Sequence, residues 1–214
     1  MPMFSSLKND SSKISEQYFK IVGLTVGLTW PCFIFLGVMA EDIILFLFGE
    51  KWLGAAPIMQ VAVILTSLWV TINYVDEVLK ATGFINVLAK SEFLFLILIA
   101  IAAGVGTQFS TVVLLYCLAI VGFIRVLTYI FMLNKLLALN WLLYLKVLLL
   151  NFMLGMILLI IIYASNSFLA LDKPFVSLLV NGVVFAVSWL VLMVVFKPPL
   201  YLVLMQMFKQ ASKK

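Results

Sequence analysis

The stretch LAIVGFIRVLTYIFML, residues 118–133, decides the fold of this 214-residue chain. It is continuously apolar except near Arg125, and it lacks the alternation of apolar and polar residues that membrane-barrel strands show. The stretch therefore predicts a helix that crosses a membrane. A charged side chain near the bilayer centre costs roughly 3 kcal/mol on insertion scales. Arg125 must consequently face protein, water or an anion instead of lipid.

The composition also indicates a membrane protein. Hydrophobic residues make up 65% of the chain and charged residues 11%, and the mean hydropathy is +1.23, which lies beyond the range of soluble domains. The chain has no histidine, the commonest metal ligand and the commonest general base near neutral pH. Cys32 and Cys117 fall in apolar segments and predict neither a disulfide nor a metal site. We expect no enzyme activity and no cofactor.

We predict an all-α, polytopic membrane protein with a bundle of six transmembrane helices over residues 18–196. Six stretches approach the roughly 20 apolar residues that a crossing requires: residues 18–39, 56–80, 91–105, 110–133, 144–164 and 175–196. Residues 1–17 form a polar amino-terminal segment. Residues 197–214 form a basic tail with an apolar stretch that we expect at the membrane surface. A short apolar run at residues 43–48 is predicted to lie at the opposite surface.

The lysines predict which ends of the helices lie in the cytoplasm. With a cytoplasmic amino terminus, eleven of the thirteen lysines fall in inner segments, and only Lys51 and Lys173 fall in outer ones. Because translocation disfavours lysine and arginine, we predict that both termini are cytoplasmic. The net charge of +5 follows from this asymmetry, so it does not indicate a nucleic-acid partner.

Polar residues in the second predicted span form a stripe if the helix is continuous. At 100° per residue, one face carries Thr66, Asn73, Asp76, Glu77 and Lys80. Asp76 and Glu77 lie close to the inner boundary, and two interpretations stay open. They are a wetted helix end with an Asp76–Lys80 pair, or a site that couples transport to a proton or cation. Asn73 lies deeper, and we expect it to line a cavity or bond a neighbouring helix.

Arg125 is the strongest functional candidate, because it lies only about 5 Å of helical rise from the predicted centre of the fourth span. Thr128 and Tyr129 share its face of the helix. One interpretation is a structural ion pair with an acid on another helix, and the other is a site for an anion. An anion site would exploit the planar guanidinium, which holds phosphate oxygens in pairs. We predict that Arg125, Asn73, Tyr129 and Thr128 line one cavity.

The first third of the chain resembles a known family. The resemblance rests on the opening P-x-F-S-x-L at Pro2–Leu7, on Tyr18 and Pro31, and above all on LFGEKWLGAAPIM at Leu47–Met59. These residues are similar to the start of the carboxy-terminal half of the oligosaccharide flippases. That family is the polysaccharide-transporter branch of the multidrug/oligosaccharidyl-lipid/polysaccharide exporter superfamily. Beyond about residue 79, only the hydropathy pattern and KATG at Lys80–Gly83 continue the likeness.

The resemblance implies one half of a transporter of the bacterial inner membrane. In that family, two six-helix halves rock around a central cationic cavity and move undecaprenyl-pyrophosphate-linked oligosaccharide, such as an O-antigen repeat unit, to the outer leaflet. A complete member has about twice this length, so we expect a fragment or a half that assembles with a separate amino-terminal half. Arg125 matches no motif residue of the family, and its role in holding the pyrophosphate is inferred from depth and charge.

Three alternatives stay open. A multidrug or cation antiporter of the same superfamily would favour an acidic, aromatic cavity without a deep arginine. An integral membrane transferase would use Asp76 and Glu77 as acid and base. A structural membrane subunit would pair Arg125 permanently with a carboxylate.

Overall fold

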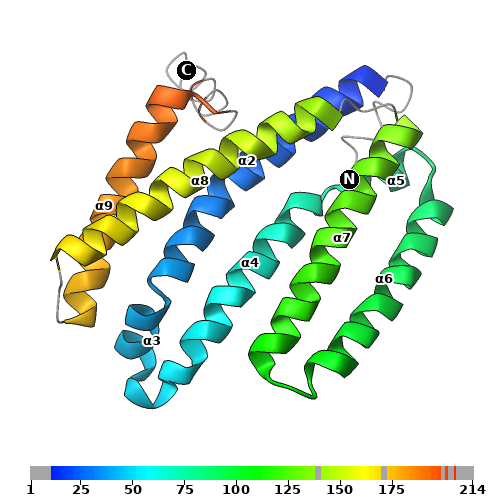
Figure 1. Ribbon diagram of the computed structural model, residues 1–214. Helices are drawn as coiled ribbons and strands as arrows, with labels where there is room; N and C mark the ends of the chain where they lie inside the picture. Colours follow the sequence, from blue (N-terminus) through cyan, green and yellow to red (C-terminus); the bar gives the residue numbers. More distant parts are fainter. Residues whose placement is uncertain (1–10, 138–140, 170–172, 199–200, 202–204, 206–214) are drawn as a thin grey trace. The chain divides into compact units, whose positions relative to one another are not determined.

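The computed structural model describes residues 11–137, 141–169, 173–198, 201 and 205. These residues contain helices and no strand, which confirms the predicted all-α class. The elements in chain order are α2 (Ser11–Val38), α3 (Ala40–Phe48), the 3-10 helix η1 (Glu50–Ala55), α4 (Ala56–Ile72), α5 (Val75–Ala81), α6 (Ile85–Gly106), α7 (Thr111–Leu137), α8 (Trp141–Leu169) and α9 (Pro174–Phe196) (Figure 1).

Within the described residues, six helical segments are long and apolar enough to cross a membrane, as predicted. They are Ile14–Val38, Glu50–Ala81, Ile85–Gly106, Thr111–Leu136, Tyr144–Leu169 and Pro174–Phe196. The third segment begins at Ile85, six residues before the predicted start, so Glu92 lies two turns inside a helix. The predicted tail, residues 197–214, and much of segment 1–17 lie outside the described residues. The cytoplasmic placement of both termini stays a prediction.

The second predicted span is not one continuous helix. α4 ends at Ile72 and α5 begins at Val75, with a turn at Asn73 and Tyr74. On α4, the Thr71 hydroxyl donates to the Ser67 carbonyl at 2.8 Å, a type of bond that often bends helices. Because the turn interrupts the helix, the side chains of α5 do not continue the regular angular spacing of those on α4. The predicted polar stripe therefore does not run unbroken across residues 66–80.

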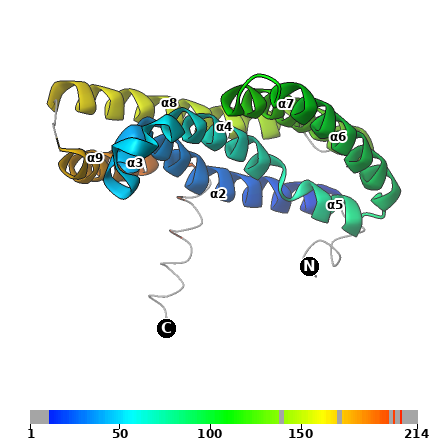
Figure 2. The same cartoon turned by 90° about the horizontal axis from the view of Figure 1, so that it is seen from below.

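The contacts of the chain define two compact units. The first comprises the described residues up to Val22 and Ile64–Val147. In it, α6 and α7 form an antiparallel hairpin and lie side by side in both views (Figures 1 and 2). The tight turn depends on Gly106, because a Cβ there would lie 2.5 Å from the Leu114 Cα. The Tyr144 hydroxyl donates to the Thr71 carbonyl at 3.1 Å and ties the start of α8 to the end of α4.

The second unit comprises Gly23–Val63 and the described residues from Leu148 onward. Here α3 packs against α9, as Figure 2 shows. Ala40, Ile44 and Ala56 form a small buried core under α3 and η1. Leu47 and Trp52 stay exposed beside this core, which is the arrangement that an interfacial segment requires.

Candidate functional site

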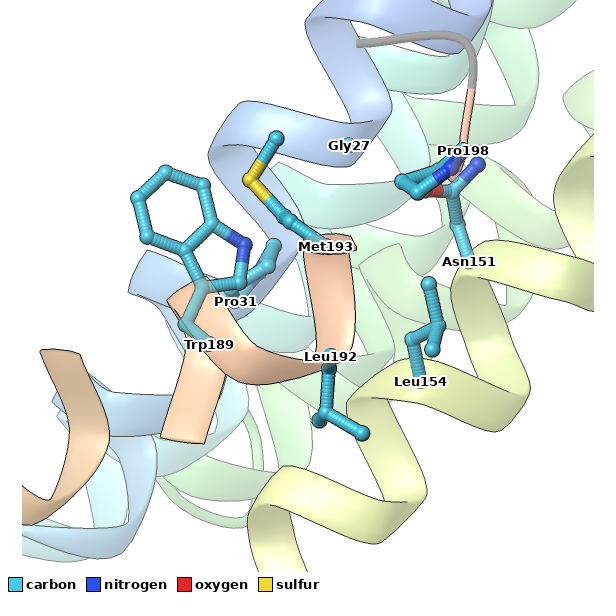
Figure 3. A pocket seen from close by; sticks show the side chains of 8 residues that line it. All are labelled: Gly27, Pro31, Asn151, Leu154, Trp189, Leu192, Met193 and Pro198. Atoms are coloured by element: carbon cyan, nitrogen blue, oxygen red, sulfur yellow. The ribbon is translucent and has the colours of Figure 1, made fainter. Parts of the chain in front are cut away.

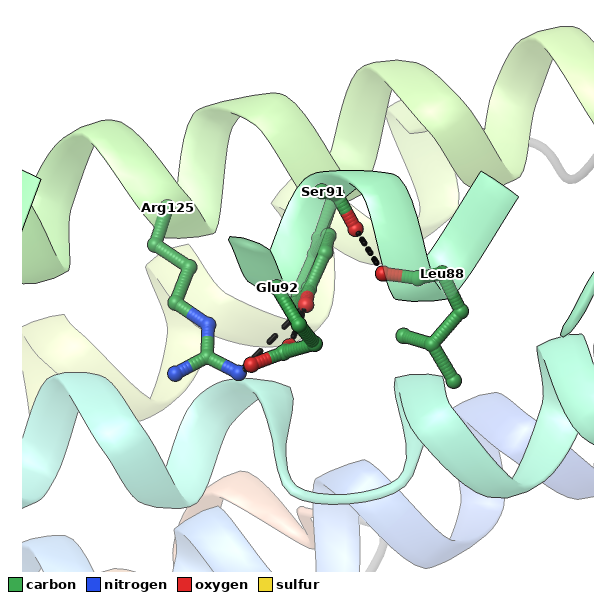
Figure 4. A network of polar contacts seen from close by, with 5 residues as sticks. Leu88, Ser91, Glu92 and Arg125 are labelled. Atoms are coloured by element: carbon green, nitrogen blue, oxygen red, sulfur yellow. Dashed lines mark hydrogen bonds and ion pairs between the residues drawn. The ribbon is translucent and has the colours of Figure 1, made fainter. Parts of the chain in front are cut away.

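Arg125 forms an ion pair with Glu92, and both belong to the first unit. The Arg125 Nη2 donates to the Glu92 Oε1, and Figure 4 shows the two side chains directed toward each other from α7 and α6. Glu92 lies 14 residues before the end of α6 at Gly106, and Arg125 lies 14 residues after the start of α7 at Thr111. Both are therefore roughly 21 Å along their helices from the hairpin turn, and the hairpin places them at equal depth.

Two aromatic rings complete the surroundings of the guanidinium. The Arg125 Cζ lies 5.3 Å from the ring centroid of Tyr129 and 5.5 Å from that of Phe95, within the range of cation–π attraction. The Tyr129 hydroxyl donates to the same Glu92 oxygen that accepts from Arg125. The Arg125 side chain is 20% exposed and Tyr129 is fully buried. A carboxylate and two aromatic faces thus compensate the cation.

The hydrogen bonds leave part of the guanidinium unused. The Arg125 Nη2 donates to the Glu92 Oε1 and also to the Tyr129 hydroxyl oxygen, which lies 3.4 Å away. Among the described residues, the buried Nε of Arg125 has no hydrogen-bond partner. A buried donor without a partner costs free energy, so this N–H has capacity for a further acceptor. Ser91, next to Glu92, is satisfied by its own helix because its hydroxyl donates to the Leu88 carbonyl at 2.8 Å (Figure 4).

Asp76 on α5 belongs to the same charged network. It interacts electrostatically with Glu92 and Arg125, and also with Lys80 and Glu77 beside it. These five groups carry three formal negative charges and two positive ones. In this structure one carboxylate, that of Glu92, already forms an ion pair with Arg125.

Asn73 and Thr128 form no hydrogen bond with the ion pair in the described part of the chain. Asn73 is exposed in the turn between α4 and α5. The Thr128 hydroxyl donates to the Ile124 carbonyl at 2.9 Å, one turn back along its own helix. The structure therefore brings Arg125 and Tyr129 together at Glu92, and Asp76 interacts electrostatically with Arg125 and Glu92. Among the described residues, neither Asn73 nor Thr128 forms a hydrogen bond with Arg125, Tyr129 or Asp76.

Glu92 was not predicted from the sequence as part of the site. It falls one residue after the predicted start of the third span at residue 91. The usable signal is the hairpin register: residues equally far from a short turn in two antiparallel helices lie at the same depth. Applied to the turn after Gly106, that rule pairs Arg125 with Glu92.

A small pocket in the second unit contains none of the predicted site residues. Its lining is Gly27, Pro31, Asn151, Leu154, Trp189, Leu192, Met193 and Pro198 (Figure 3). Most of these side chains are apolar, and a narrow apolar pocket does not recognise an anionic head group. Within the described ranges, no three residues of the types histidine, cysteine, aspartate and glutamate are grouped to hold a metal ion.

The six apolar helical segments indicate a multi-pass membrane protein, and the Arg125–Glu92 ion pair joins two of these segments. Residues 1–57 match the family model described as "Polysaccharide biosynthesis protein". Together with the relatives below, this match confirms the predicted resemblance to the polysaccharide-transporter family. No solved structure matches the chain.

Three curated proteins are similar to parts of the chain. The protein TuaB of Bacillus subtilis, named for teichuronic acid biosynthesis, is 34% identical over 82 residues. The protein WzxC of Escherichia coli, named for lipopolysaccharide biosynthesis, is 23% identical over 109 residues. A Klebsiella pneumoniae protein described as an uncharacterized membrane protein in the cps region is 24% identical over 97 residues. The matched segments cover 38%, 51% and 45% of this chain but only 17%, 22% and 20% of the relatives, in the same order.

Proposed function

We propose that this chain is part of a transporter that moves a lipid-linked oligosaccharide, carried on undecaprenyl pyrophosphate, across the bacterial inner membrane. Six apolar helices and the similarity to proteins named for teichuronic acid and lipopolysaccharide biosynthesis support the proposal. An amino-terminal six-helix half, from the same gene or from a separate chain, would complete the transporter.

The observation that carries a substrate role is the incompletely bonded guanidinium of Arg125. Its Nε–H has no partner among the described residues, while Nη2 is held by Glu92. A pyrophosphate oxygen could accept from Nε, and a second oxygen could replace the Glu92 carboxylate at Nη2 to give the bidentate pairing that arginine favours. In this proposal Glu92 compensates Arg125 when no substrate is bound and is displaced by the head group.

Asp76 and Glu77 are the proposed residues for coupling transport to a cation gradient. Displacement of Glu92 would remove it from Arg125 and leave its charge near Asp76, with which it already interacts electrostatically. Two carboxylates close together in a poorly solvated site favour the uptake of a positive charge. Substrate binding and cation binding would therefore be linked through Arg125.

The same contacts also favour one alternative, a structural role for the ion pair. A permanently paired arginine on α7 would fix the α6–α7 hairpin and would never contact substrate. The two roles differ in what neutralising both partners does. Removing one partner leaves an uncompensated charge, whereas removing both removes the pair cleanly.

The deciding experiment uses cells whose surface polysaccharide depends on the gene that encodes this chain. Arg125→Gln, Glu92→Gln and the double variant are compared for surface glycan and for the amount of protein in the membrane. For a head-group role, the double variant restores the protein level while export stays about tenfold or more below wild type, in line with the loss of charge-assisted hydrogen bonds. Restoration of both export and protein level by the double variant would refute the head-group role.

A further inference from the structure

The part of α2 that belongs to the second unit contains a proline. A carbonyl in an α-helix accepts from the N–H four residues later, and proline has no N–H. The Gly27 carbonyl therefore lacks its regular donor, because the residue four positions on is Pro31. The Thr29 hydroxyl does not replace that donor, since it donates to the Thr25 carbonyl at 2.8 Å. The Gly27 carbonyl thus needs a donor other than an amide at position 31.

The surroundings of Gly27 restrict where that donor comes from. Gly27 and Pro31 are both buried, and they lie in the first segment that is long and apolar enough to cross a membrane. Lipid chains carry no hydrogen-bond donor, and a polar group left unpaired in such surroundings costs free energy. Membrane helices tolerate proline where a neighbouring side chain or an ordered water molecule serves the freed carbonyl.

The small pocket of the second unit lies at this position. Gly27 and Pro31 both line it, and its volume is about 10 Å³. A cavity of this size admits one water molecule and is too small for a larger ligand. Its other lining residues come from α8, from α9 and from Pro198 just after α9 (Figure 3). The space therefore lies where a donor to the Gly27 carbonyl is required.

The lining also supplies polar partners for a water molecule. Asn151 on α8 is buried, and Figure 3 shows its side chain directed from α8 toward Pro198. Its amide group carries both donors and an acceptor. The indole N–H of Trp189, a further donor, lies on the side of its ring that is nearest to Pro31 in the same view. A buried water molecule typically makes about three hydrogen bonds, and the pocket is lined by groups of both kinds.

We infer that this pocket is a binding site for one ordered water molecule, which donates to the Gly27 carbonyl and accepts from the Asn151 amide. The water molecule supplies the proton that Pro31 lacks, so it allows α2 to carry a proline within an apolar segment. It also joins α2 to α8 inside the second unit. The inference does not rest on the proposed function, because it concerns the packing of these helices and not a transported substrate.

A double-mutant cycle tests the bond to Gly27. The purified full chain is unfolded in mixed micelles as wild type, Asn151→Leu, Pro31→Ala and the double variant. Asn151→Leu replaces the amide with an apolar side chain of similar size, and it should lower the folded-to-unfolded ratio about tenfold. In the Pro31→Ala background, the new N–H at position 31 serves the Gly27 carbonyl. The same change should therefore lower the ratio only about threefold or less.

Ser177→Ala is the control for this cycle, because it removes a buried hydroxyl that does not line the pocket. It should lower the folded-to-unfolded ratio by the same factor with Pro31 and with alanine at that position. Equal effects of Asn151→Leu in the two backgrounds overturn the inference. A background dependence of Ser177→Ala as large as that of Asn151→Leu also overturns it, since Pro31→Ala would then act on the whole unit.

Nuclear magnetic resonance detects the water molecule directly in the wild-type chain, so the test does not depend on Asn151→Leu being folded. With ¹⁵N-labelled asparagine, selective excitation of water should transfer magnetisation to the side-chain N–H of Asn151. A long-lived bound water gives this transfer opposite signs in the laboratory and rotating frames, whereas proton exchange does not. The conservative variant Asn151→Gln identifies the signal by its loss. Asn73, exposed in the turn after α4, is the internal control and should show no such transfer. Absence of the transfer at Asn151 overturns the inference.

Discussion

Arg125 stays within a membrane helix because a carboxylate and two aromatic rings replace its hydration shell. Glu92→Ala should therefore destabilise the protein by about 1–3 kcal/mol, because it leaves the guanidinium without its counter-charge. The value lies below the 3–5 kcal/mol or so of a fully buried pair, since Glu92 is 39% exposed. Unfolding in mixed micelles measures the effect. Asp76→Ala is the control, and an equal loss of stability in both variants would contradict the dominance of the Glu92 pair.

Tyr129 contributes a hydroxyl and a ring, and the two contributions can be separated. Tyr129→Phe removes the hydrogen bond to Glu92 but keeps the ring over Arg125, so we expect a loss of about 1 kcal/mol. Tyr129→Leu also removes the cation–π contact and should cost about 0.5–2 kcal/mol more. The same unfolding measurement compares them. If both variants lose equal stability, the ring does not contribute to holding the cation.

The sequence was sufficient to predict that Arg125 avoids lipid and that Tyr129, four residues later, shares its helix face. It was not sufficient to name Glu92, because the partner of a side chain on another helix depends on the register of the two helices. That register is fixed by a close backbone approach at one glycine, which no pattern of apolar residues reveals. Asp76 was noticed as an acid, but its interaction with Arg125 depends on how α5 packs beside α6.

At the scale of elements, the α6–α7 hairpin determines which residues meet. A Cβ at Gly106 would lie 2.5 Å from the Leu114 Cα, and backbone atoms cannot move aside cheaply. Gly106→Ala should thus destabilise the protein by about 1–3 kcal/mol, as overpacking typically does. Gly104→Ala is the matched control, because a Cβ there meets no atom within 4 Å. Thermal unfolding distinguishes them, and equal stability of both variants would show that the turn tolerates a side chain.

The break between α4 and α5 shows why six spans could be counted from the sequence although the second was not a single helix. Counting depends on the summed hydropathy of about 20 residues, which a local turn barely alters. Asn73 and Tyr74 form this turn without a proline or glycine to mark it. Sequence periodicity assumes an uninterrupted helix, so it predicted one polar stripe where the structure has two helical segments.

For the whole molecule, the orientation predicted from the lysines can be tested at two opposite ends. In a background of Cys32→Ala and Cys117→Ala, single cysteines replace Gly54 in η1 and Lys135 in the last turn of α7. Both positions are exposed, and a Cβ at Gly54 meets no atom within 4 Å, so neither change should disturb the fold. A membrane-impermeant maleimide applied to intact cells should label Gly54→Cys and leave Lys135→Cys unlabelled until the cells are permeabilised.

The expected labelling follows from the cost of translocating cations. Eleven lysines would have to cross the membrane in the opposite orientation, against two in the predicted one. Labelling of Lys135→Cys but not Gly54→Cys in intact cells would reverse the predicted topology.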